Sequence, residues 1–375
     1  MEKSPITTTT RKARLLSLDA LRGFDMFWII GGDKLIIALA TLQGMAWLQP
    51  VAAQMRHVPW EGFHFYDLIF PLFMFISGVA IPFAITSKVE NGVSKNSLLM
   101  KIIKRGLVLV VFGIIYNGAL QHGFENARYA SVLGQIGIAY VLAAAIVLFN
   151  RKMVVQGLWL TAILGVIALL QLVVPVPGYG AGNFDGVMSF NAWLDQLLLP
   201  GRLIGGTFDN EGILNVISAS TVTLAGALAG GILRNENISP NRKTLVISIS
   251  GLVLVGIALL LSPFYPIIKN MWTVPFNLLT AGLSALLLSL FYFLIDVKKY
   301  NRGIGAYVVF FFSVIGLNSI TIYMGARIIS FSRMSTFFLG WLSEPLGEWI
   351  IILGVIVLEW LFLYYLYKRN LFLKV

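Results

Sequence analysis

The chain has 375 residues, of which 58% are hydrophobic and only 12% are charged, and it carries a net charge of +11 and no cysteine. About a quarter of the residues of a soluble domain are charged, so this composition is typical of a polytopic membrane protein and argues against a soluble one. The lack of cysteine excludes disulfides and thiolate sites, and basic cytoplasmic loops explain the positive charge better than a nucleic-acid partner does.

Apolar stretches of about 20 residues are long enough to cross a bilayer as helices. There are ten: 17–41, 66–86, 100–120, 130–149, 154–174, 211–233, 244–262, 273–295, 304–326 and 347–367. They lack the alternation of barrel strands, so helices are expected. We predict an all-α membrane protein with one helical domain over 17–367, an N-terminal arm (1–16) and a C-terminal tail (368–375).

Basic residues orient these predicted helices. Lys and Arg gather in alternate connections: 1–16, 87–105, 150–153, 234–243, 296–303 and 368–375. The positive-inside rule therefore places both termini in the cytoplasm and all three histidines on or next to the outer face. The polar N-terminal arm does not resemble a secretory signal peptide.

The first apolar stretch contains five ionisable residues: Asp19, Arg22, Asp25, Asp33 and Lys34. Each charge at membrane depth costs on the order of 3 kcal/mol, so a simple anchor would not carry them. Asp19 and Arg22 can pair at the inner boundary, which leaves Asp33 unexplained. Positions 19, 22, 26, 29 and 33 share one helical face, roughly 21 Å long, and we predict that this face lines a passage through the membrane.

The segment "RHVPWEGFHFYDLIFP" (56–71) holds two of the three histidines, His57 and His64, just before the second apolar stretch. Asp67 begins that stretch, where it can cap the helix, orient a histidine, or do both.

A basic group, Lys101, Lys104 and Arg105, lies at the inner boundary of the third stretch. It serves either to orient the helix or to bind a phosphate from the cytoplasm.

"RLLSLDALRG" followed by "HVPWEGFHFYDLIFPLFMFISG" resembles the transmembrane acetyltransferase family of heparan-α-glucosaminide N-acetyltransferase and its bacterial relatives. The later stretches "LGQIGIAYVLAA", "DNEGILNVISASTVTLAGALAG", "KNMWTVPFNLLTAGLSALLLSLFYFLID" and "GLNSITIYMG" resemble the family in the same order. The resemblance covers nearly the whole chain, although "LDALRG" alone occurs in a wider superfamily of membrane acyltransferases.

This resemblance implies that an acetyl group passes from cytosolic acetyl-CoA to the amine of a terminal glucosamine on the far side of the membrane. The family's histidine corresponds to His57, the expected general base, and its aspartate before "LVFP" corresponds to Asp67. The family has an asparagine where this chain has Asp33. Direct transfer to the amine and a covalent acetyl-histidine are both compatible with these residues.

Five further residues are predicted to bind the acceptor. Trp60 belongs to the family stretch, whose "WNG" is "WEG" here, so that Glu61 adds an acidic group suited to a cationic amine. His64 lies beside them without a family counterpart, and Glu211 and Asn318 are candidates on the resemblance alone.

At the inner mouth we predict that the nucleotide end of CoA binds to residues of the first and third helices, namely Asp19, Arg22, Lys101, Lys104 and Arg105. We expect no metal cofactor. The expected location is a bacterial inner membrane, and a homodimer is expected from the resemblance only. The alternatives are a transporter of amino sugars or cell-wall fragments, for which Asp25 and Asp33 could relay protons, and an O-acyltransferase of a surface glycan.

Overall fold

The computed structural model describes residues 15–124, 126–300 and 302–373; most of the predicted arm and the end of the predicted tail lie outside these ranges. The described residues form helices and loops without a β-strand, which confirms the predicted all-α fold. The helices are α1 (Leu16–Phe27), α2 (Asp33–Leu39), α3 (Gln49–Gln54), α4 (Phe65–Ile81), α5 (Ser87–Glu90), α6 (Lys95–Tyr116), α7 (Ala119–His122), α8 (Val132–Phe149), α9 (Met153–Leu172), α10 (Phe190–Leu198), α11 (Ile213–Arg234), α12 (Pro240–Leu261), α13 (Val274–Phe291), α14 (Ile304–Leu317), α15 (Ser319–Ile328), α16 (Phe331–Leu346) and α17 (Trp349–Lys368).

Each of the ten predicted spans coincides with a helix or with two consecutive helices. Within the described ranges, seven helices are long and apolar enough to cross a membrane, and the α14–α15 pair, bent by 67°, could make an eighth span. The two predicted spans outside this set, α1–α2 and α6, are helical as well and contain the charged residues noted in the sequence.

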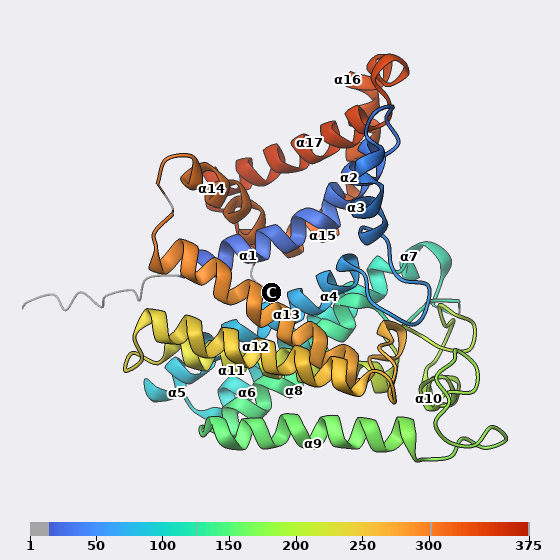
Figure 1. The fold of residues 1–375 in the computed structure, drawn as a ribbon, viewed down its shortest axis with the longest axis vertical. Coiled ribbons are helices and arrows are strands. Elements are labelled where there is room, and N and C mark those ends of the chain that lie inside the picture. The colour runs from blue at the N-terminus through green and yellow to red at the C-terminus, as the bar shows by residue number, and fades with distance from the viewer. Residues whose placement is uncertain (1–14, 125, 301, 374–375) are drawn as a thin grey trace, which may run out of the picture.

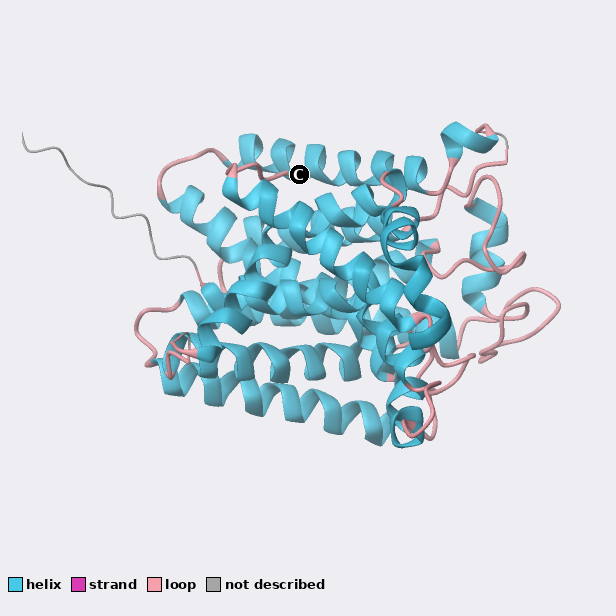
Figure 2. Cartoon of the chain, turned by 90° about the horizontal axis from the view of Figure 1, so that it is seen from above, coloured by secondary structure: helices cyan, strands magenta, loops and turns pink. Residues whose placement is uncertain are grey.

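The bundle has two ends at which the connecting loops collect. In Figure 1 the connections α5–α6 and α11–α12 and the loop before α14 lie on the left, whereas the α3–α4 loop, α10 and the α12–α13 loop lie on the right. Viewed from above, the loops again form two separate groups at the ends of the helices (Figure 2). These three basic connections thus share one end; that this end faces the cytoplasm stays a prediction.

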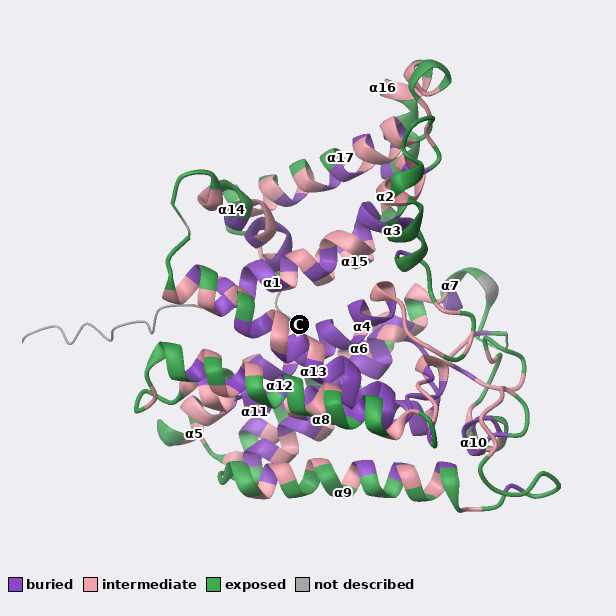
Figure 3. Cartoon of the chain, in the orientation of Figure 1, coloured by how far each residue is buried: buried purple, intermediate pink, exposed green. Residues whose placement is uncertain are grey.

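The burial of side chains distinguishes a central layer of helices from an exposed, apolar exterior. Buried residues are concentrated in α4, α11 and α13, whereas α9 has a largely exposed outer face (Figure 3). That face is apolar and includes Leu158, Trp159 and Val166. Apolar side chains on an outer face are expected where lipid rather than water is the solvent.

A break divides the first predicted span. Trp28–Gly32 forms a π-helical turn, in which Gly31 has a φ of 136°, and α2 begins at Asp33. Only a residue without a Cβ adopts this conformation readily. The π-turn therefore interrupts the regular helical period between Arg22 and Asp33 on which a straight helical face depends.

Glycines allow α1 and α14 to pack closely. A Cβ at Gly23 would lie 1.7 Å from the carbonyl oxygen of Phe312, and one at Gly316 would lie 2.0 Å from the carbonyl oxygen of Asp19. The two backbones therefore touch where they cross, as small residues permit in membrane helices.

Gly23→Ala is expected to lower the apparent Tm of the detergent-solubilised protein by roughly 2–10 °C, because overpacking costs about 1–3 kcal/mol. Gly165→Ala in α9 is the matched control, since its Cβ would meet no atom within 4 Å. The control is expected to keep or raise the Tm, because alanine favours the helix. Equal Tm values for the two variants would contradict this packing.

Candidate active site

His57 lies in the loop between α3 and α4, and Asp67 in the first turn of α4 holds its ring. The Nδ1 atom of His57 is 2.7 Å from Oδ1 of Asp67. The other oxygen, Oδ2, accepts the backbone N–H groups of Val58 (3.3 Å) and His64 (3.0 Å). Asp67 therefore caps the helix and orients His57 at the same time, so the two alternatives left by the sequence are compatible.

This geometry defines the tautomer that we assign to His57. A buried carboxylate accepts hydrogen bonds, so Nδ1 carries the proton and Nε2 keeps its lone pair in the neutral ring. The side chain of His57 is 53% exposed, whereas that of Asp67 is 1% exposed. The ring also packs against Tyr66, with 4.8 Å between ring centroids. An oriented imidazole whose side chain is half exposed can act as a general base.

Lys269, in the loop between α12 and α13, completes this group and was not predicted from the sequence. Glu61 and Ile268 form an antiparallel bridge, and the N–H of Gly62 donates to the carbonyl of Ile267 (2.9 Å). This pairing brings Lys269 Nζ to 3.2 Å from Oδ1 of Asp67 and 2.8 Å from Nδ1 of His57. The only signal in the sequence is a single lysine in the apolar loop "PFYPIIKNMW".

Burial lowers the pKa of the Lys269 ammonium, and the charge of Asp67 opposes this effect only in part. The side chain is 16% exposed. Lys269 is therefore a desolvated cation paired with a buried carboxylate, a state typical of functional sites.

The neighbours of His57 shape the loop around it. Trp60 Nε1–H donates to the carbonyl of Phe184 (2.7 Å) and so ties this loop to the long loop between α9 and α11. His64 is the residue before α4, and its Nδ1 lies 2.9 Å from the carbonyl oxygen of Arg56. Glu61 is exposed. Contacts of these three side chains with an acceptor stay a prediction.

Asp33 meets the site through Tyr66. Asp33 is 8% exposed, its Oδ1 has no hydrogen-bond partner in the described part of the chain, and its carboxylate lies close to the hydroxyl of Tyr66. Among the described residues, no hydrogen bond joins Asp33 to His57. Since the ring of Tyr66 packs on His57, Asp33 could influence the base only indirectly, and its predicted catalytic role stays a prediction.

Glu211 belongs to a buried ionic cluster at the same end of the bundle. Arg128 donates through Nε and Nη2 to the two oxygens of Asp209 (2.8 and 2.6 Å), and Nη2 also contacts Glu211. Burial by itself lowers the pKa of the Arg128 guanidinium. The carboxylates of Asp209 and Glu211 outweigh this effect and raise that pKa. Glu211 is also within electrostatic reach of Lys269.

Arg128→Met is expected to destabilise the protein by about 3–5 kcal/mol, because it leaves two buried carboxylates without their cation. The apparent Tm should fall accordingly in thermal unfolding of the solubilised protein. Arg202→Met, at an exposed arginine in the loop between α10 and α11, is the control and should leave Tm within about 1 °C. Similar Tm values in both variants would show that the cluster is not a stabilising one.

Three cavities lie in series along α4. The largest, 600 Å³, is lined by Asp19, Arg22, Arg234 and Lys243 among others, and the second, 220 Å³, shares Arg22 and Ala80 with it and adds Arg105. Arg22 Nη1 lies 3.6 Å from Asp19 Oδ1, the pairing expected from their spacing.

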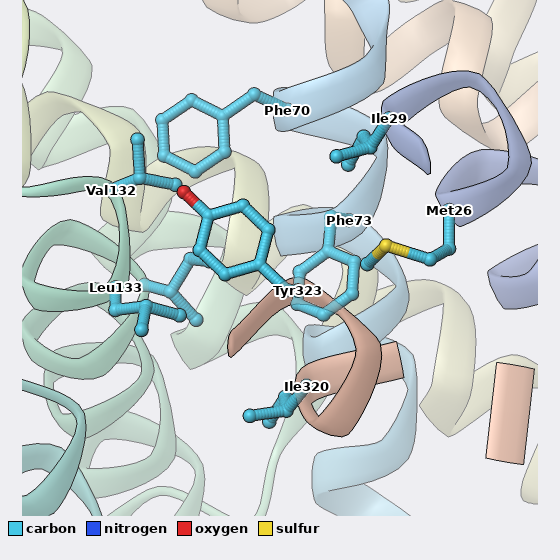
Figure 4. Close-up of a pocket in the computed structure, with 9 residues that line it drawn as sticks. Met26, Ile29, Phe70, Phe73, Val132, Leu133, Ile320 and Tyr323 are labelled. Atoms are coloured by element: carbon cyan, nitrogen blue, oxygen red, sulfur yellow. The ribbon is translucent and has the colours of Figure 1, made fainter. Parts of the chain in front are cut away.

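The third cavity shares Phe73, Ile136 and Ile320 with the second and has a volume of only 30 Å³. Figure 4 shows Tyr323 and Phe70 at this constriction, with the Tyr323 hydroxyl beside Val132.

One face of α4 connects the cavities with the histidine site. Phe70, Phe73, Ser77 and Ala80 line the cavities at helical spacing, and Tyr66, whose ring packs on His57, begins the same face. On the opposite wall, α1 contributes Arg22, Met26 and Ile29, part of the face that the sequence predicted to line a passage.

Two predicted groups lie elsewhere. Lys101 and Lys104 are exposed and line none of these three cavities. Asn318, at the bend between α14 and α15, donates to the carbonyl of Leu371 (3.1 Å) and accepts from the N–H of Leu373 (3.4 Å). It therefore holds the C-terminal segment beside the middle cavity, and its contact with an acceptor stays a prediction.

Comparison with known proteins supports the resemblance seen in the motifs. Residues 14–187 match a family described as a domain of unknown function, DUF5009. The heparan-alpha-glucosaminide N-acetyltransferase of Homo sapiens is 27% identical over an alignment of 382 positions, which covers 84% of this chain and 53% of that protein. The enzyme of the same name from Mus musculus is 26% identical over 378 residues, covering 85% and 56%.

The chain thus spans little more than half the length of these two relatives. Its aligned portion nevertheless includes most of the helical bundle described above. The chain is therefore similar to the heparan-alpha-glucosaminide N-acetyltransferases over most of its own length, and its apolar helices are those of a multi-pass membrane protein.

Proposed function

We propose that this protein is a membrane acetyltransferase that moves an acetyl group from acetyl-CoA, bound from the cytoplasmic end, to the amine of a glucosamine-type sugar at the outer end. The observation that carries the proposal is the single face of α4, which runs from a basic cavity at one end of the bundle to Tyr66 at the other, where the ring of Tyr66 packs on His57 of the His57–Asp67 pair. The names of the two relatives supply the reaction type and the acceptor class.

At the outer end, His57 acts as the base. Its Nε2 takes a proton from the amine as the new C–N bond forms, and Asp67 stabilises the resulting imidazolium. The C–S bond of the thioester then breaks, and the imidazolium returns the proton to the thiolate. Proton balance is complete within this site, so direct transfer does not require an acetyl-histidine.

At the inner end, Arg22 and Arg105 are suited to hold phosphate groups of the donor. Both line the 220 Å³ cavity, and Nε of Arg105 is a buried donor with no partner in the described part of the chain. An unsatisfied buried guanidinium donor fits a phosphate oxygen, and arginine binds phosphate with its planar fork. Bound there, acetyl-CoA supplies the activated acetyl group.

The 30 Å³ constriction is too small for an acyl thioester. Side chains such as Phe73 and Tyr323, which line it, must move before the acetyl group reaches His57. The proposed reaction therefore includes a conformational step within the bundle.

Reconstituted vesicles test this function. With labelled acetyl-CoA supplied on the side of the basic loops and glucosamine on the other side, we expect labelled N-acetylglucosamine on the glucosamine side. An ester product, cleaved by hydroxylamine where an amide survives, would indicate an O-acyltransferase instead. The absence of labelled product on either acceptor atom would reject the proposed function. The side on which acetyl-CoA must be supplied tests the proposed orientation in the inner membrane. Cross-linking in the same vesicles tests the proposed homodimer.

A proton-coupled sugar transporter is the second candidate, favoured by one observation. Asp25 is fully buried in α1, and neither of its carboxyl oxygens has a hydrogen-bond partner among the described residues. Ionisable groups of this kind occur in proton relays of transporters. Accumulation of unmodified glucosamine inside the vesicles, without labelled product, would favour this candidate.

A further inference from the structure

Lys269 is placed unusually close to the proposed base. Its Nζ lies 2.8 Å from Nδ1 and 3.3 Å from Nε2 of His57, and 3.2 Å from Oδ1 of Asp67. The same oxygen of Asp67 lies 2.7 Å from Nδ1 of His57. One buried carboxylate oxygen thus serves two groups that can each carry a positive charge.

The surrounding charges support only one cation at this point. From α4, Asp67 contributes one negative charge and Tyr66 contributes a neutral ring against His57. Glu211, ahead of α11, is within reach of Lys269, but it is paired with Arg128. Two cations about 3 Å apart repel each other strongly where water is partly excluded, so an ammonium and an imidazolium compete for Asp67.

We infer that Lys269 and His57 share a single positive charge over Asp67, and that Lys269, by holding this charge in the resting state, keeps His57 unprotonated and ready to accept a proton. The role of His57 in this statement rests on the proposed function. Lysine is ordinarily a much stronger base than histidine, and Asp67 stabilises the Lys269 ammonium against the effect of burial, so the resting positive charge belongs to Lys269. Lys269 is a positioning residue, since it acts through His57.

The arrangement also explains how the proton would leave His57. When Nε2 takes the proton of the amine, an imidazolium forms beside the Lys269 ammonium. Repulsion between the two makes the imidazolium a stronger acid and favours transfer of its proton to the departing thiolate. Lys269 keeps its own protons throughout, so the reaction remains balanced.

The test is a pH titration of His57 in the full-length protein by nuclear magnetic resonance with labelled histidine. The chain has only three histidines, so His57→Gln assigns the signal. In Lys269→Met we expect the midpoint of the His57 titration to rise by about one pH unit or more, because the competing cation is lost. Lys269→Arg keeps the charge and should remain within about 0.3 unit of the wild type.

Lys269→Gln is a second neutral variant, of use if Lys269→Met does not fold, and unchanged signals of the other two histidines report correct folding. A midpoint in both neutral variants equal to that of the wild type overturns the inference. This titration requires no acetyl transfer, so its outcome is independent of the outcome of the vesicle assay.

In the transfer assay, kcat is measured as a function of pH. The acid limb of this profile should move to higher pH in Lys269→Met, by the same interval as the His57 midpoint, and should keep its wild-type position in Lys269→Arg. A purely structural role for Lys269 would instead lower kcat equally at every pH, and that result would also contradict the inference.

Discussion

His57→Gln is expected to lower kcat for acetyl transfer by roughly 10²–10⁴-fold, the range typical for loss of a general base. Glutamine approximates the size of histidine and can still donate a hydrogen bond to Asp67, but it cannot take the proton of the amine. The KM for acetyl-CoA should change little, because the base lies at the outer end and the donor's phosphates bind at the inner end. Initial rates in the vesicle assay measure both constants.

The matched control for this variant is His122→Gln, which changes the third histidine of the chain and is expected to retain activity. Each variant should keep the Tm of the wild type within a few degrees, so that loss of activity is not loss of fold. Retention of most of the activity by His57→Gln would remove His57 as the base and leave Lys269 as the nearest alternative.

Arg22→Ala and Arg105→Ala are each expected to weaken acetyl-CoA binding at least about tenfold, because a charge-assisted hydrogen bond contributes roughly 1.5–3 kcal/mol. Both guanidinium groups line the same 220 Å³ cavity, so the double variant tests whether they bind one ligand. Calorimetry or displacement of labelled CoA from the solubilised protein measures the affinity directly.

Arg302→Ala, at an exposed arginine near the same end of the bundle, controls for general loss of positive charge and should bind CoA normally. Lys101→Ala and Lys104→Ala separate the cavity from the basic surface, since both lysines lie outside the three cavities. Unchanged affinity in both arginine variants would place the nucleotide elsewhere, and a loss in the lysine variants would move it to the surface of α6.

The pairing of His57 with Asp67 was foreseeable because both residues lie in one short segment, before and within the first turn of α4. Lys269 was not foreseeable, because it is 212 residues from His57 in the chain and reaches it only through the pairing of two loops. The position of Asp33 relative to Arg22 could not be derived from the sequence for a different reason: the π-turn at Gly31 interrupts the helical period on which that prediction depended.

The helical architecture followed from the chain alone, because the length and apolarity of each span are local properties matched to the thickness of a bilayer. The same local information located the charged positions of α1 and the histidine segment before α4. Folding alone determined that Arg22 and Arg105 share a cavity, that Lys101 and Lys104 do not, and that Lys269 joins His57. Such convergence depends on how helices rotate and loops pair in three dimensions, and neither hydropathy nor helical period contains that information.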